Sequence, residues 1–300
     1  MNSDTAAWVI TGPTSGIGYQ TALELASHGT VVLVGRNLTK IAAVRREIEA
    51  SGGAATEVVA DLSDVTSARR AAAEIAALDL PIRGVLNNAG TMLSEPALNA
   101  QGWELTFATN HLGPLAFTDA LIPSLADGTN IVFITSGAED PDLRAARIVG
   151  FRGSRYISAQ AASRGEHRSG GASRAGADAY ATSKQGNLAA TFALAREFSR
   201  LRFRAIQPGV NITSSLGDNP AAVRVIGRLL GPVLTLLPHF TSPVRVAKVI
   251  TRILTDTSGA TGVYFDEQGR LMTGSDQVTD PAYADRYIAE SRELLASVPT

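Results

Sequence analysis

The stretch that decides the fold is Trp8-Val9-Ile10-Thr11-Gly12-Pro13-Thr14-Ser15-Gly16-Ile17-Gly18, an apolar run that leads through a glycine loop into a helical pattern. Gly12 permits a tight turn, Gly16 lets the backbone approach a diphosphate, and Gly18 allows close packing of helix on strand. The N-terminus of the helix offers free amides and a positive dipole end to phosphate. In this setting the loop favours dinucleotide binding over a plain structural turn.

Short β-rich runs alternate with longer helical patterns along the rest of the chain. Strands are expected at 8–10, 31–34, 57–60, 84–86, 130–134, 203–206 and 262–265, and helices at 16–27, 38–50, 64–78, 103–125, 178–200, 244–254 and 282–295. Strands separated by helices of this length predict right-handed βαβ units and a parallel sheet. The strands are continuously apolar, which is typical of a sheet covered by helices on both faces. We therefore predict an α/β fold.

Composition narrows the function classes. The formal net charge is −1, so nothing attracts the chain as a whole to nucleic acid or to an anionic membrane. Cysteine is absent, which excludes disulfides and thiol catalysis, and the four histidines show no metal-ligand spacing. Residues 1–7 lack the form of a secretory signal. We expect a cytoplasmic protein without a metal, and the excess of arginine over lysine suggests a GC-rich bacterial gene.

Several motifs together resemble the short-chain dehydrogenase/reductase family, over nearly the whole chain. The glycine loop resembles its TGxxxGIG loop, and Asn87-Asn88-Ala89-Gly90 matches its NNAG motif. Tyr180 and Lys184 stand four apart on a predicted helix, which puts them on one face. The resemblance implies a single Rossmann-type doubly wound domain over 1–300, with a seven-stranded parallel sheet in the order 3-2-1-4-5-6-7. It also implies hydride transfer between a nicotinamide cofactor and a ketone or secondary alcohol.

The resemblance assigns four catalytic residues. Tyr180 is the acid/base, and a nearby ammonium from Lys184 is expected to lower the phenol pKa from about 10. Lys184 also binds the nicotinamide ribose. Ser136 orients the reacting oxygen, although a serine at a strand end can equally be a cap. Asn110, within Thr109-Asn110-His111-Leu112-Gly113, anchors a water in a proton relay.

The cofactor is expected to be NADP(H) rather than NAD(H). Gly35 stands where members that prefer NAD carry a carboxylate, and Arg36 can contact a 2′-phosphate. Arg36 is otherwise a solvated loop charge, Asp61 can equally be a helix-capping or turn residue, and Thr213 can be a helix cap. The expected cofactor residues are Gly12, Thr14, Ser15, Gly16, Ile17, Gly18, Arg36, Asp61, Leu62, Asn88, Ala89, Gly90, Tyr180, Lys184, Pro208, Gly209, Val210 and Thr213.

The chain also departs from the family pattern. Residues 109–113 and 261–265 resemble the retinol-dehydrogenase-like subset, but an insertion at 137–177 has no strong period, and its part at 158–176 looks flexible. Residues 214–241 are expected to form an apolar substrate lid. We expect reduction of an apolar, medium to large carbonyl compound. The chain is expected to form a homodimer or homotetramer, without a nucleic-acid or membrane partner. Two alternatives stay open: an epimerase, dehydratase or cyclase on this scaffold, and a non-catalytic NADP(H)-sensing protein.

Overall fold

The computed structural model describes residues 6–95, 97–174, 176–209 and 241–299, and its centre is one eight-stranded sheet in the order β3-β2-β1-β4-β5-β6-β7-β8. The strands are β1 (Ala7–Thr11), β2 (Thr30–Gly35), β3 (Ala54–Val59), β4 (Ile82–Asn87), β5 (Asn130–Ile134), β6 (Arg202–Ile206), β7 (Val263–Phe265) and β8 (Leu271–Met272). The predicted α/β class and the order of the first seven strands are confirmed, and these strands are parallel. The two-residue β8 was not predicted; it pairs antiparallel with β7 and is too short to show a period.

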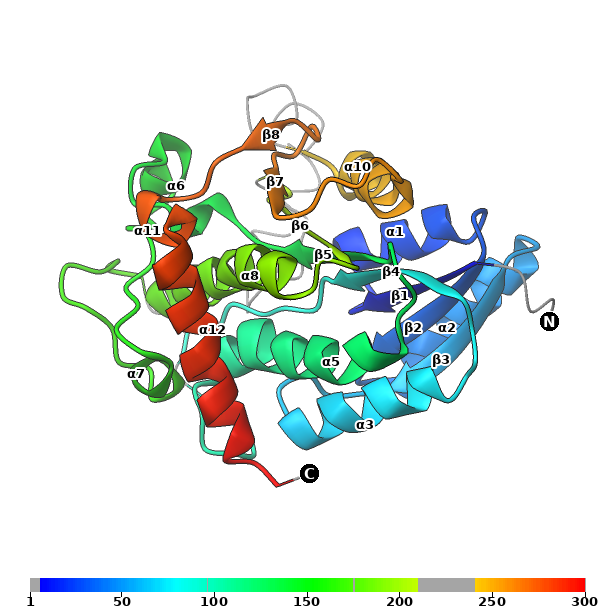
Figure 1. Ribbon diagram of the computed structural model, residues 1–300, viewed down its shortest axis with the longest axis horizontal. Coiled ribbons are helices and arrows are strands. Elements are labelled where there is room, and N and C mark those ends of the chain that lie inside the picture. The colour runs from blue at the N-terminus through cyan, green and yellow to red at the C-terminus, as the bar shows by residue number, and fades with distance from the viewer. Residues whose placement is uncertain (1–5, 96, 175, 210–240, 300) are drawn as a thin grey trace.

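Helices cover both faces of the sheet, as Figure 1 shows. One face packs against α1 (Gly16–Leu25), α2 (Leu38–Ala50) and α10 (Pro243–Thr255). The other packs against α3 (Val65–Ala76), α5 (Gly113–Leu121) and α8 (Ala177–Glu197), and α12 (Pro281–Ala296) packs on α8. Among the residues described, no helix is both long enough and apolar enough to cross a membrane.

The helix predicted over 103–125 is broken into four pieces. They are α4 (Leu105–Phe107), the π-helical turn η1 (Ala108–Leu112), α5 and the 3₁₀ turn η2 (Ile122–Ser124). In an α-helix the carbonyl of Asn110 would bond the N–H of residue 114, but Pro114 has none. The chain widens instead, and the Gly113 N–H bonds the carbonyl of Ala108, five residues back.

The insertion at 137–177 is more regular than its sequence indicates. It contains the 3₁₀ turn η3 (Gly137–Glu139) and the helices α6 (Arg144–Ile148) and α7 (Ala159–Ser163), and α7 lies within the part expected to lack order. Its anchor is Tyr156, whose ring stacks on Tyr287 of α12 at a centroid distance of 3.7 Å and whose hydroxyl donates to Glu290 at 2.6 Å. These contacts are tertiary, so no local period reports them. The expected lid at 214–241 lies outside the described residues, apart from Thr241.

Gly113 offers a test of this packing. A Cβ there would lie 1.7 Å from the backbone oxygen of Leu62, so α5 has to move away from the loop after β3. We predict that Gly113→Ala lowers the free energy of unfolding by about 3 kcal/mol, the upper range for overpacking.

The matched control is Gly52→Ala, at an exposed turn where φ is +82° and no atom lies within 4 Å of the new Cβ. It should cost only the left-handed backbone penalty of about 1 kcal/mol. Urea denaturation measures both variants. Equal losses would contradict the close contact at Gly113.

Candidate active site

The glycine loop between β1 and α1 has the geometry expected of its three glycines. Gly12 has a φ of +69°, and Gly16 has a φ of +56° with no atom within 4 Å of where a Cβ would stand. A Cβ on Gly18 would lie 2.3 Å from the oxygen of Gly12, so only glycine permits this approach of helix to loop. The loop is therefore tightly packed at both ends and open beside Gly16.

Asn88 fixes this loop to the end of β4. Its side-chain amide donates to the backbone oxygens of Thr11, at 2.9 Å, and Gly12, at 3.1 Å. The Thr11 hydroxyl accepts from the backbone N–H groups of Asn88 and Ala89, each at 3.0 Å. These bonds join the carboxyl ends of β1 and β4, where ligands of doubly wound folds bind.

Lys184 joins α8 to the end of β5. Its ammonium, 2% exposed, donates to the Ile134 oxygen at 3.0 Å, and the Asn187 amide donates to the same oxygen at 3.1 Å. In return the Thr135 hydroxyl donates to the Lys184 oxygen at 2.8 Å. Burial lowers the pKa of Lys184 to about 8, because desolvation disfavours the ammonium.

Tyr180 lies beside Lys184 and Ser136. The Lys184 Nζ is 5.5 Å from the centre of the phenol ring, and the Ser136 side chain lies close enough to lower the pKa of the phenol. Burial raises the pKa of Tyr180 and outweighs this opposing effect of Ser136. The structure thus gives the opposite direction to the lowering that the sequence argument expects. Ser136 is also a cap, since its Oγ accepts from the Ala138 N–H at 3.2 Å.

The side chain of Asn110 serves as a brace. Its Oδ1 accepts from the Thr91 N–H at 2.7 Å, and its Nδ2 donates to the Thr91 oxygen at 2.8 Å and to the Ser183 hydroxyl at 3.1 Å. A Cβ on Gly90 would lie 3.1 Å from the Asn110 Oδ1 and 3.6 Å from the Lys184 Nζ. The loop after β4 is thereby held against the helix that carries Tyr180.

The residues expected around the adenosine are more exposed. The Arg36 side chain is 72% exposed and lies 3.9 Å from the Asp61 carboxylate, and Asp61 Oδ1 accepts from the N–H and hydroxyl of Ser63. Asp61 therefore has the turn-capping role, which does not exclude a ligand. Among the other expected cofactor residues, Leu62 and Ile17 are buried and Thr14 is half-buried. Ser15 is the N-cap of α1. Pro208 and Gly209 lie in the loop after β6. Val210 and Thr213 lie outside the described residues.

Two residues near the centre were missed by the sequence reasoning. Phe151, in the insertion, places its ring 5.8 Å from that of Tyr180. Glu139 is 1% exposed and accepts from the Ser275 N–H at 3.0 Å, the Ser275 hydroxyl at 2.6 Å and the Gln185 amide at 3.4 Å. Neither belongs to a motif or a periodic pattern, so only the position of Glu139 three residues after Ser136 could have drawn attention to it.

Comparison with known proteins gives a match to the family model described as short chain dehydrogenase over residues 6–146. A short-chain dehydrogenase/reductase of Armillaria gallica is 29% identical over 206 residues, which cover 67% of this chain and 63% of the relative. Mouse retinol dehydrogenase 12 is 28% identical over 293 residues, 96% of this chain and 85% of the relative. Two further curated relatives, from Emericella nidulans and Neocamarosporium betae, are matched over only 40% of their own length. These relatives are eukaryotic and do not support a bacterial origin.

Solved structures share the fold. A crystal structure of a protein of Mycobacterium paratuberculosis has a TM-score of 0.70 and 25% identity, covering 98% of this chain and 94% of that one. The blue fluorescent protein from a metagenomic library, crystallised in complex with NADPH, has a TM-score of 0.65 and 24% identity, covering 90% and 98%.

The buried carboxyl of Glu139 should make the free energy of unfolding depend on pH. Burial raises its pKa from 4.5 to about 7, so the folded state favours the protonated carboxyl. A group whose pKa is higher in the folded state than in the unfolded state stabilises the fold fully at pH values below its unfolded-state pKa. This stabilisation is lost as the pH rises through its folded-state pKa. The wild type should lose on the order of 3 kcal/mol from this group between pH 4.5 and 7.

Glu139→Gln removes the titration, so its stability relative to wild type should be higher at pH 8 than at pH 5 by on the order of 3 kcal/mol. Denaturant unfolding at both values measures this, with the exposed Glu74→Gln as the control expected to show no such change. A difference between Glu139→Gln and wild type that is the same at both pH values would contradict the assignment.

Proposed function

From the premise that this chain belongs to the short-chain dehydrogenase/reductase family, we propose that it is an NADP(H)-dependent oxidoreductase that reduces a ketone to a secondary alcohol. The observation that carries the proposal is the convergence of Tyr180, Ser136 and Lys184 at the carboxyl end of β5. The glycine loop, tied by Asn88 to the end of β4, stands at the same edge of the parallel sheet. Ligands of such sheets bind at this edge.

The residues present fit a dinucleotide. Gly16 presents open backbone at the start of α1, where the free amides and the helix dipole favour a diphosphate. Gly90 leaves space beside Lys184 that a larger residue would fill. When bound, the nicotinamide cofactor supplies the hydride. Gly12, Thr14, Ser15, Gly16, Ile17 and Gly18 would hold its diphosphate, with Asn88, Ala89, Gly90, Lys184, Pro208, Gly209, Val210 and Thr213 around the remainder.

The chain's own groups would move the proton. Tyr180 has a raised pKa, so its phenol is protonated at neutral pH and can donate to a carbonyl oxygen that becomes an alkoxide. The Ser136 hydroxyl would orient that oxygen. Lys184, with a pKa of about 8, is largely an ammonium near neutral pH; it would hold the ribose and help to reprotonate Tyr180. Asn110 braces the loop beside both residues. A protonated phenol is the form of Tyr180 that the reductive direction requires.

Two observations support the finer parts of the proposal. Arg36 projects from the end of β2 with an exposed guanidinium, which suits a 2′-phosphate, and the NADPH complex cited above has the same fold. Phe151 forms an apolar wall against Tyr180, which suits an apolar substrate.

Tyr180→Phe tests the reaction. It removes the proton donor and keeps the ring, so we predict a fall in kcat of about 10²–10⁴-fold, the usual contribution of general acid catalysis. A screen of carbonyl compounds that follows NADPH absorbance measures it, with binding of NADPH followed by fluorescence. Tyr19→Phe is the control, since Tyr19 hydrogen-bonds Glu47 at the surface. Unchanged turnover in Tyr180→Phe, or no NADPH binding in the wild type, would refute the proposed reaction.

Arg36→Gln tests the choice of cofactor. It removes a charged contact to the 2′-phosphate, so the Kd for NADPH should rise about 10- to 100-fold, in line with a hydrogen bond to a charged group, while the Kd for NADH stays unchanged. Lys40→Gln, on the exposed side of α2, removes one positive charge close to Arg36 and should leave the Kd values for NADPH and NADH unchanged. Parallel weakening of NADPH and NADH in Arg36→Gln would count against a 2′-phosphate contact.

A further inference from the structure

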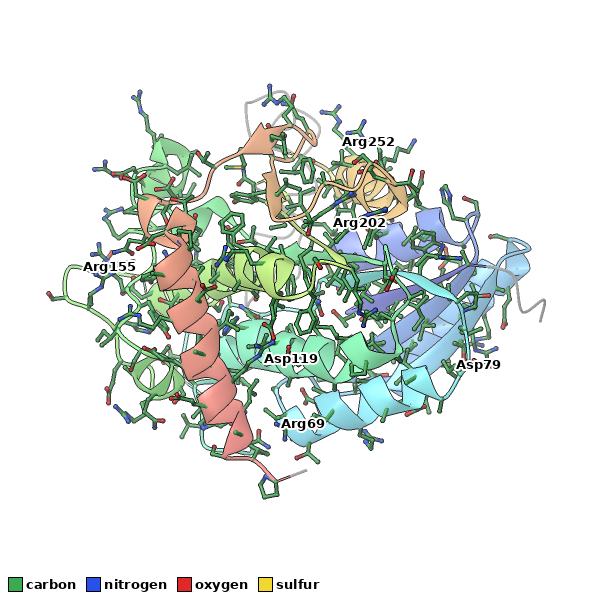
Figure 2. The ribbon with its side chains drawn as sticks, viewed as in Figure 1. Arg69, Asp79, Asp119, Arg155, Arg202 and Arg252 are labelled. Carbon is green, nitrogen blue, oxygen red and sulfur yellow. The ribbon has the colours of Figure 1, made fainter. Side chains whose placement is uncertain are left out.

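A cavity of about 440 Å³ lies between the insertion at 137–177 and the start of α11 (Asp276–Thr279). Three of its lining residues are Arg152, Arg155 and Arg168, and we call it the arginine cavity. Figure 2 shows Arg155 beside α11 and α12, at one end of the molecule. None of the residues assigned above to the reaction or to the dinucleotide lines it.

Within the part of the chain that the structure describes, none of the three guanidinium groups forms an ion pair with a carboxylate. Asp142 and Asp276 also line the cavity, but within the described residues no ion pair joins either of them to an arginine there. Most other arginine ion pairs of this fold are short, for example Arg292 with Asp119 at 2.8 Å. Three positive charges against two negative ones leave the cavity with a net positive charge, and its cations are not neutralised in pairs.

Hydrogen bonds hold Arg155 and Arg168 in place, and one side-chain N–H of Arg155 lacks an acceptor among the described residues. The Arg155 Nε is buried and has no acceptor among the described residues. Its backbone N–H donates to the Thr182 hydroxyl at 3.2 Å, and its backbone oxygen accepts from the Arg168 N–H at 3.0 Å. Arg168 in turn donates to Gln277 at 3.2 Å. The side chains of Arg152 and Arg168 are exposed at the cavity, so an oxyanion there can accept hydrogen bonds from their guanidinium groups.

We propose that the arginine cavity binds the oxyanion group of a small molecule, a carboxylate or a phosphate. Guanidinium groups recognise both through forked, charge-assisted hydrogen bonds. The site goes beyond the proposed reaction and does not depend on it. It also has a structural link to the reactive centre, because Arg152 directly follows Phe151, whose ring lies against Tyr180. The anion is therefore either the acidic end of the substrate or a separate small anion.

Titration with inorganic phosphate, followed by thermal unfolding at constant ionic strength, tests the site. NADP(H) is present at saturation so that phosphate does not compete for the glycine loop. Phosphate should raise the Tm saturably in the wild type and in Arg144→Gln, a change of the same charge on exposed α6. Arg155→Gln and Arg168→Gln should each need at least tenfold more phosphate for half of the effect. Arg168 is exposed, so its variant keeps the test valid if Arg155→Gln does not fold.

Equal responses in all variants, or none in the wild type, would overturn the proposal. So would loss of the response in Arg36→Gln alone, because the phosphate would then occupy the dinucleotide site. A second arm separates the two sources of the anion. If the anion belongs to the substrate, Arg168→Gln raises KM for a keto acid at least tenfold and leaves its methyl ester unchanged. If it is a separate anion, both KM values stay constant while phosphate still protects the wild type; either result supports the cavity as an oxyanion site.

Discussion

The proposed reactive centre depends on the hydrogen bond from the Lys184 ammonium to the backbone oxygen of Ile134. It holds a cation almost without exposure at the junction of α8 and β5, where the Thr135 hydroxyl and the Asn187 amide add two further bonds. A buried ammonium needs such partners, because desolvation otherwise disfavours it. Once this junction is formed, the helical spacing of four residues brings Tyr180 to the same face and toward Ser136, just past the end of β5.

The pKa directions at this junction follow from burial. Desolvation moves the phenol and the ammonium toward their neutral forms, and it therefore raises the pKa of Tyr180 and lowers that of Lys184 to about 8. The ordinary values of 10.0 and 10.5 lie close together, so burial moves the two pKa values apart, and the ammonium becomes the stronger acid of the pair. Within the described residues, the protein part of the site thus keeps the phenol protonated, with the ammonium beside it as the stronger acid.

Some of this arrangement could be predicted from the sequence because it rests on local spacing. The glycine loop and the pair Tyr180 and Lys184 need only a strand, a turn and a helix in known order. The alternation of elements predicts the parallel sheet, and the strand order followed from the family resemblance. The helix over 103–125 was predicted as continuous although Pro114 lies within it. Proline has no backbone N–H, and this missing donor is the local cause of the π turn at Asn110.

The insertion could not be predicted in the same way. The insertion is ordered by contacts with later parts of the chain. The ring of Tyr156 stacks on that of Tyr287. Hydrogen bonds join Glu139 to Ser275 and Arg155 to Thr182. A single sequence without internal period carries no information on such partners. The position of Phe151 against Tyr180 is a consequence of these contacts, and so is the arginine cavity.

The most direct measurement is the pKa of Tyr180 itself, by NMR of protein labelled with ¹³C at the tyrosine Cζ, with its resonance assigned by comparison with Tyr180→Phe. We predict a pKa above that of free tyrosine in the protein alone, and a lower value when NADP⁺ is bound, because a cation beside the phenol favours its ionised form. A pKa below 10 in the protein alone, or one that does not respond to NADP⁺, would contradict this prediction.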